Sequence, residues 1–406
     1  MGDSFGNTLP RRMPSTERPG KPWKVEQAPR EAEQDDEDAL IEAERQEVRE
    51  LEKLADRLEQ VKQQLANAPG PADDTAGAST ELLTAKVLGL HLEGDGAVIS
   101  YRSGDELKEE IRETCYIDAD GSEEELARLG LDHLEHGGKL LIYGEEARVL
   151  ARVFGRELRR PLRRGLVDVK RDEAMAVLEE ELRILREARA VVVAVVVPDV
   201  SAEEASLLRF HEELLRGMLE VKGRKAVMVP ATEAAARECP GDAQSVAVTV
   251  HVGADWTGTG LSFAGITGKK WGLAYGIQDV LDKASGVTSV PGEKLRRALL
   301  QGREGEGTEM AGMAARVFLG ELFGMVAGRL AEEVKSGWPE KSPGIVRMCG
   351  EGAGFASARE LMEGCLEKAG LRETFGKVEV LAEPEFAAAR GAVLLGEAEL
   401  KKRAGG

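Results

Sequence analysis

At 406 residues the chain is too long for one ordinary core, since domains commonly hold about 100–200 residues. Its formal net charge of −18, from 73 acidic and 55 basic residues, argues against a nucleic-acid partner or an anionic lipid surface, because these need clustered Lys and Arg. The only long apolar run, AVVVAVVVP at 190–198, is too short for a bilayer span of about 20 residues and predicts a buried strand.

The first 84 residues predict an arm and a linker. Residues 1–35 are rich in Pro, Gly and charge and are expected to be disordered. Residues 36–68 are helix formers with a narrow apolar stripe, which predicts a coiled-coil helix that self-associates; a helix packed on its own globular domain is the alternative. Residues 69–84 are expected to be a linker. The members of the stripe are Val48, Leu51, Leu54, Leu58, Val61 and Leu65.

From residue 85 onward strand and helix signals alternate, which is typical of an α/β fold. Two β-hairpins are predicted, one at 86–101 around EGDG and one at 245–266 around GADWTGT. Each is followed by strand–helix units, so we expect two copies of one α/β domain, 85–244 and 245–400, with a cleft between them. Further strands are predicted at 139–143, 191–197, 225–229, 345–349 and 378–381, and helices at 172–188, 202–220 and 384–395.

The four cysteines are Cys115, Cys239, Cys349 and Cys365, and they lack CxxC spacing and a histidine at a zinc-ligand distance in sequence. Neither a disulfide framework nor a metal site is therefore expected. No apolar segment follows Arg11 and Arg12, so a secretory signal is not predicted. A cytoplasmic location is expected instead. The arginines of 156–164 are interpreted as a solvated loop beside a domain junction, with no ligand assigned.

Motifs along residues 85–400 resemble the bacterial actins, most closely the MreB and MamK type, within the superfamily of actin, heat-shock chaperone and sugar-kinase ATPases. The most specific is GEEARVLARVFGRELRRPLRRGLVDVKRDEAM at 144–175, which is similar to that family's GdeA…GR…rPl…D…eaM run. The order and spacing continue through four more segments: PATEAAA (230–236), VHVGADWTGTG (250–260), GIVRMCGEGAG (344–354) and AEPEFAAARGAVLLG (382–396). The resemblance implies a two-domain actin-like fold, a duplicated ribonuclease-H-like unit with an interdomain cleft.

The resemblance also implies a nucleotide site. In the family, glycine N–H groups of both hairpins meet the phosphates, two aspartates hold Mg²⁺ through water, and a glutamate positions the attacking water. The positions of this chain that correspond to the family's cofactor-binding site, and that we expect to be degenerate, are His91, Glu93, Gly94, Gly96, His251, Gly253, Ala254, Asp255, Gly350 and Gly352.

Several departures from the family pattern predict a lost or weakened ATPase, with no catalytic residue and no cofactor assigned. His91 and His251 occupy the two aspartate positions, and imidazole is a poor Mg²⁺ ligand. Glu93 and Asp255 place carboxylates where phosphate oxygens belong, and Glu351 replaces a glycine. The glutamate position holds Ala231 or Thr232, while Glu233 is shifted by two residues. ATP and Mg²⁺ are the expected cofactors if the site is retained.

Alternative interpretations of these positions remain open. The aspartates could be displaced in the alignment, because Asp95, Asp242 and Asp255 lie nearby. The two histidines could be interior strand residues without a joint role. A metal site built on the two histidines would need a third convergent ligand, and the sequence shows none, so no metal ligands are assigned. Trp256 is expected to be a packing residue.

The leading functional hypothesis is a cytoskeletal or scaffold protein of the actin type that has lost ATP binding and hydrolysis. One alternative is a working ATP-dependent filament protein for cell shape or organelle positioning; another is a non-polymerising adaptor for an envelope machine. The expected partners are a second copy, through the coiled coil and filament contacts, and a protein at a cell-envelope or cytoskeletal structure. Recruitment to the inner face of the membrane would then occur through that partner.

Overall fold

The computed structural model describes residues 75–94, 96–221, 223–239, 246–263, 266–300, 309–336 and 344–405. The expected tail at 1–35 and coiled coil at 36–68 lie outside these residues. Of the expected linker, 75–84 is described, and there the expectation is wrong: Thr75–Thr84 forms helix α2. Leu82 of this helix is fully buried in the first hydrophobic core, which anchors the helix.

Lobe I is defined by a five-stranded sheet of order β10-β9-β1-β2-β3. Strands β1, β2 and β3 form an antiparallel meander, while β9 and β10 run parallel to β1. The apolar run at 190–198 supplies β9, which is buried along its whole length, as expected for a strand covered on both faces. The strands are β1 Val87–Glu93, β2 Gly96–Ser103, β3 Glu106–Glu113, β9 Val192–Val197 and β10 Lys225–Pro230.

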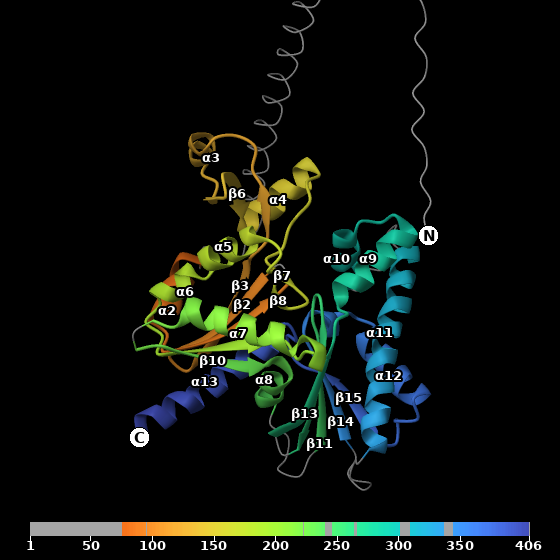
Figure 1. The fold of residues 1–406 in the computed structure, drawn as a ribbon. Coiled ribbons are helices and arrows are strands. Elements are labelled where there is room, and N and C mark those ends of the chain that lie inside the picture. The colour runs from red at the N-terminus through yellow and green to blue at the C-terminus, as the bar shows by residue number, and fades with distance from the viewer. Residues whose placement is uncertain are drawn as a thin grey trace, which may run out of the picture. The chain divides into compact units, whose positions relative to one another are not determined.

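Lobe II is defined by a second five-stranded sheet, of order β13-β12-β11-β14-β15. Its antiparallel and parallel pairings repeat those of lobe I, with β11 as the central strand in place of β1. The predicted duplication of an α/β unit is therefore confirmed, and Figure 1 shows the two sheets in separate halves. The strands are β11 Val246–Val252, β12 Thr257–Phe263, β13 Ile266–Leu273, β14 Gly344–Cys349 and β15 Phe375–Val380.

Helices cover both sheets, and a small subdomain extends lobe I. The helices of lobe I are α5 Asp172–Glu181, α6 Arg183–Glu187 and α7 Ala205–Leu219; those of lobe II are α9 Ile277–Thr288, α10 Gly292–Leu300, α11 Glu309–Lys335 and α12 Ala358–Lys368. The subdomain contains β4 Tyr116–Asp118, α3 Glu123–Leu129, β5 His133–His136, β6 Lys139–Tyr143 and α4 Gly144–Phe154, followed by the hairpin β7 Leu162–Arg163 and β8 Leu166–Val167. Short 3₁₀ turns lie at η1 Ala202–Glu204 and η2 Glu351–Gly354.

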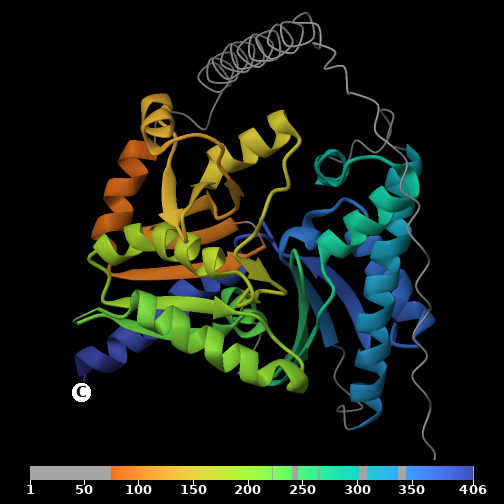
Figure 2. The same cartoon turned by 45° about the horizontal axis from the view of Figure 1, so that its top comes forward.

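Two helices, α8 (Ala231–Glu238) and α13 (Ala387–Gly405), pack against each other where the lobes join. Their approach depends on small residues: a Cβ on Gly391 would lie 1.8 Å from the carbonyl oxygen of Ala234. Although α13 begins within 245–400, the range predicted for the second domain, it contacts β1 and β9 of lobe I. Figure 2 shows this helix, in blue, beside the strands of lobe I.

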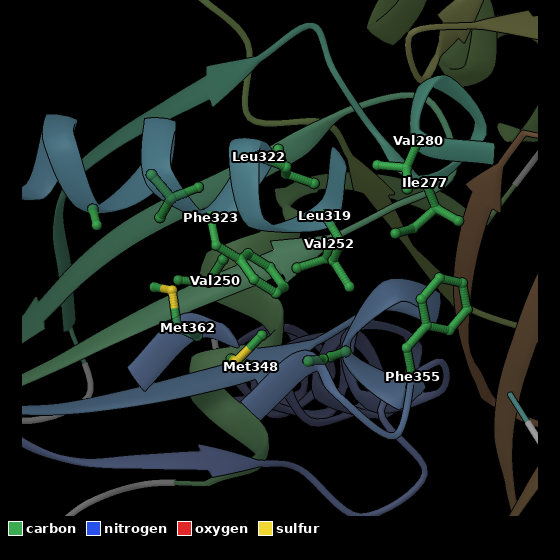
Figure 3. Close-up of a cluster of buried hydrophobic side chains, with 14 of the residues drawn as sticks. Val250, Val252, Ile277, Val280, Leu319, Leu322, Phe323, Met348, Phe355 and Met362 are labelled. Atoms are coloured by element: carbon green, nitrogen blue, oxygen red, sulfur yellow. The ribbon is translucent and has the colours of Figure 1, made fainter. Parts of the chain in front are cut away.

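The core of lobe II is built around α11, whose buried face includes Leu319, Leu322 and Phe323. These side chains pack on Val250 and Met348 of the sheet (Figure 3). By length and mean hydropathy α11 also meets the criteria for a membrane-spanning helix. The sequence analysis did not predict such a segment, because charged residues interrupt the apolar residues of α11. Core helices of soluble proteins meet the same criteria, so this is weak evidence for a membrane span.

Candidate functional site

The turns of the two predicted hairpins meet at the interface of the lobes. Glu93, the last residue of β1, reaches across to the β11–β12 turn, where its Oε1 atom accepts the backbone N–H of Ala254 at 2.8 Å. The same oxygen lies 3.3 Å from Nε2 of His251. The Glu93 side chain is 12% exposed and that of His251 is fully buried. A carboxylate of the protein therefore occupies a backbone anion-binding position that the resemblance assigned to phosphate.

Two glycines make room for this contact. A Cβ on Gly253 would lie 1.9 Å from Oε1 of Glu93, so a side chain there would expel the carboxylate. Gly94 has a φ of +55°, which glycine adopts without strain, and a Cβ on it would lie 2.8 Å from the Cβ of Ala254. Glycines that the family resemblance associated with phosphate thus admit a side chain of the protein instead.

His91 and His251 lie on the central strands of the two sheets and face each other. Their ring centroids are 5.0 Å apart, and His251 also stacks on Trp256 with centroids 4.8 Å apart. Trp256 is 3% exposed within a hydrophobic cluster, so its predicted packing role is confirmed. Both histidines are interior strand residues, as one alternative expected, and the fold brings their rings to one place.

Electrostatics divide the two imidazoles into one charged and one neutral group. Burial opposes charge on His251, but the Glu93 carboxylate outweighs burial and raises the pKa of His251. Burial also opposes charge on Glu93, yet His251 lowers the pKa of that carboxyl. At neutral pH these two groups form a buried ion pair. Burial, with a contribution from His251, lowers the pKa of His91 to about 4, so His91 is neutral.

The third glycine-rich turn joins the same place, as predicted. Gly350 has a φ of +83° and donates its N–H to the carbonyl of Pro384 at 2.7 Å. Gly352 packs against Val252, and Sγ of Cys349 lies 3.5 Å from Nδ1 of His251. Of the predicted site residues Gly96 is placed differently, because its nearest neighbour is the Arg112 carbonyl of β3.

The other two acids at family glycine or phosphate positions, Asp255 and Glu351, are each paired with an arginine, and the sequence did not reveal these pairs. Asp255 lies 3.6 Å from Arg160, and Glu351 lies 3.2 Å from Arg296. Both guanidinium groups donate to Oε1 of Gln278, at 2.8 Å and 3.2 Å. Arg160 confirms that 156–164 lies beside a domain junction, because it pairs with Asp255 across the lobes, but its side chain is half-buried rather than fully solvated. The negative charge expected at this site is balanced by the protein itself.

Asp199 is a second buried acid that the sequence gave no reason to select. It follows β9, is 4% exposed, and accepts the backbone N–H of Thr232 at 3.0 Å. Burial raises its pKa to about 6, against which the hydrogen bonds from Thr232 act. Gly258 and Gly272 of lobe II pack on it, so Asp199 also bridges the lobes. Of the three aspartates that the sequence analysis considered as displaced metal ligands, Asp95 and Asp242 lie outside the described residues.

Three ligand atoms of suitable chemistry converge between the lobes. His91, Glu93 and His251 each offer one atom, and these atoms lie within 4.8 Å of one another. Glu93 is thus the third convergent ligand, which could not be recognised from the sequence. Its position next to both histidines depends on how the two hairpins approach, which spacing along the chain does not reveal.

Comparisons with known proteins agree with this architecture. The family model Volactin matches residues 88–395, and the chain belongs to that family. The structure is similar to the MamK double helical filament (TM-score 0.56, 14% identity, covering 77% of this chain and 98% of that one). It is also similar to MreB5 of Spiroplasma citri bound to ADP (TM-score 0.55, 11% identity, 79% and 98%). These likenesses show the actin-like fold. No curated protein sequence matches the chain.

Proposed function

We propose that this member of the Volactin family is an actin-fold scaffold protein whose interlobe cleft is closed by its own side chains rather than by a nucleotide. The observation that carries the proposal is the contact of the Glu93 carboxylate with the Ala254 N–H and with His251. Lobe I thereby supplies the anion that a nucleotide supplies in a nucleotide-dependent actin.

Electrostatics disfavour ATP at this position. A phosphate could take over the Ala254 N–H and His251, but Glu93 sits at the end of β1 and would stay beside it as a like charge. Two anions held about 4 Å apart near a protein surface repel by about 4 kcal/mol, which weakens binding by roughly 1,000-fold. An ATP site of micromolar affinity would not survive that penalty.

The arginine pairs support the same reading. Arg160 and Arg296 could attract a triphosphate, but each is engaged with a carboxylate and with Gln278. A nucleotide would have to replace those contacts and would leave Asp255 or Glu351 without its cation. Leaving one member of a partly buried charge pair unpartnered is costly, so the network favours the closed arrangement.

Assembly is the second part of the proposal. The MamK structure similar to this chain is a double helical filament. By analogy of fold we propose that this chain also assembles with copies of itself, with the predicted coiled coil at 36–68 adding a dimer contact or recruiting a partner. The acidic composition, with 73 acidic residues, is consistent with a cytoplasmic protein that reaches the envelope through such a partner.

Sedimentation of the full chain, with and without Mg-ATP, tests the proposal, and negative-stain microscopy identifies what sediments. We expect polymer in both conditions, to the same extent. Polymer that requires ATP would instead identify a nucleotide-driven filament, and the closed-cleft proposal would fail. A chain that stays soluble in both conditions would identify a non-polymerising adaptor, and the assembly part would fail.

A further inference from the structure

We propose that His91, Glu93 and His251 bind one transition-metal ion of the zinc class, which cross-links the two lobes. This inference rests on the proposed function, because the ion would occupy a cleft closed without nucleotide. The first observation is the convergence of three ligand atoms within 4.8 Å. Two of the groups come from β1 of lobe I and one from β11 of lobe II, so an ion bound to all three would hold the hairpins together.

An independent observation is the state of His91. Its side chain is 1% exposed, and neither ring nitrogen has a hydrogen-bond partner among the residues that the structure describes. Buried polar groups are almost always satisfied, so an unsatisfied imidazole at the heart of a sheet calls for an explanation. Nδ1 of His91 lies 4.0 Å from Oε2 of Glu93, which is too far for a hydrogen bond. A metal ion bound to Nδ1 of His91 would satisfy that nitrogen.

One of the ligand distances already matches a metal site, and the others require the side chains to move. Zinc bonds to nitrogen and oxygen are about 2.0–2.2 Å long, so tetrahedral ligand atoms lie roughly 3.3–3.5 Å apart. Nε2 of His251 and Oε1 of Glu93 are 3.3 Å apart, which matches. The ion would replace the proton that Nε2 of His251 carries in the ion pair with Glu93, and that proton would be released to solvent. Nδ1 of His91 lies 4.0 Å from the other oxygen of Glu93, Oε2, and the three ligand atoms span up to 4.8 Å. Binding of all three groups therefore requires the ligand atoms to approach by up to roughly 1.5 Å, through rotation of the His91 and Glu93 side chains.

The surroundings resemble a second coordination shell. Metal-bound imidazoles are usually oriented through the ring nitrogen that does not bind the metal, and metal-bound carboxylates are themselves hydrogen-bonded. Here Nδ1 of His251 contacts Sγ of Cys349 at 3.5 Å, its ring stacks on Trp256, and Oε1 of Glu93 accepts the Ala254 N–H. The orientation of two of the three ligands is thus fixed before an ion binds.

The donor set decides the class of ion. Two imidazoles with one carboxylate suit Zn²⁺ and its transition-metal neighbours, whereas Mg²⁺ prefers oxygen ligands and water. The proposed ion is therefore bound directly by side chains, without a nucleotide. Three protein ligands leave a fourth coordination position to water or a small anion.

The test uses the full chain, stripped of metal with EDTA, and titrates ZnCl₂ by calorimetry in competition with a chelator. We expect one equivalent to bind and the melting temperature to rise. His91→Gln should weaken binding by at least about 100-fold, more than the 10–100-fold lost on changing a second-shell group. His136→Gln, at the end of β5 and outside the three-residue cluster, is the matched histidine control and should bind zinc like the unchanged chain. Cobalt(II) gives a readout that needs no variant, because four-coordinate Co²⁺ produces strong visible absorption.

Absence of saturable zinc binding together with absence of the cobalt absorption would overturn the proposal. Zinc binding that His91→Gln leaves unchanged would overturn it too, since the ion would then lie elsewhere. Mg-ATP titrated into the same metal-free sample separates the two proposals. If neither zinc nor ATP binds, the metal site fails while the closed cleft stands; if ATP binds tightly, the closed cleft fails whatever zinc does.

Discussion

Replacing Glu93 with Ala should destabilise the protein strongly, because it leaves the imidazolium of His251 without a partner. His251 is fully buried, and its Nε2 atom lies 3.3 Å from the lost carboxylate. Removing one member of a buried ion pair costs about 3–5 kcal/mol, and the 12% exposure of Glu93 favours the lower end, about 3 kcal/mol. Part of this loss is recovered if His251 gives up its proton.

Urea unfolding followed by circular dichroism, with EDTA present, measures the effect. With an m-value of about 3 kcal/mol/M, a loss of 3 kcal/mol lowers the midpoint by about 1 M. Glu106→Ala removes an exposed carboxylate of β3 and should change stability by no more than about 0.5 kcal/mol. The double variant Glu93→Ala with His251→Gln should cost less than the sum of the single changes. A loss below about 1 kcal/mol for Glu93→Ala, or strict additivity, would refute the interlobe ion pair.

Three further outcomes are expected. Gly253→Ala places a Cβ 1.9 Å from Oε1 of Glu93, so it should cost about 1–3 kcal/mol in unfolding experiments, and clearly less when Glu93 is already Ala. His211 of α7 is 1% exposed, and its Nδ1 atom accepts the Val167 N–H, so burial lowers its pKa to about 4. The stability from its neutral form is complete above about pH 6.5 and is lost as pH falls toward 4, so the unchanged chain should lose up to about 3 kcal/mol more than His211→Asn across that range. Equal losses in urea unfolding would show that His211 is not a buried neutral imidazole. The double variant Leu51→Glu, Leu58→Glu should lose the dimer contact of the predicted coiled coil, which light scattering detects as a lower molar mass. An unchanged mass would show that this segment serves another contact.

Much of the fold could be predicted because its signals are local. The alternation around EGDG gave the β1–β2 hairpin, and the run at 190–198 gave β9. The long helix α11 was not predicted, because Arg316 and Glu321 interrupt its apolar residues and its buried stripe only has meaning against the sheet of lobe II. The helix at Thr75–Thr84 was missed because its Gly and Thr content resembles a linker, while the burial of Leu82 in the core overrides that weak propensity.

The candidate site divides in the same way. Motif positions identified His91, Glu93 and His251 as unusual, but not as partners of one another. That relation depends on the approach of two hairpins that are far apart in the chain, and only the folded structure fixes it. The arginine cluster at 156–164 was visible in the sequence, but neither Arg160 nor Arg296 could be linked to an acid, because each balances a carboxylate that comes from another segment.

Calorimetric titration of Mg-ATP into the metal-free full chain tests the closed cleft most directly. If Glu93 holds the anion position, no saturable binding tighter than about 10 μM, or about −7 kcal/mol, should be detected. Saturable binding tighter than that, abolished by His251→Gln, would show that the hairpins accept phosphate and would contradict the proposed function.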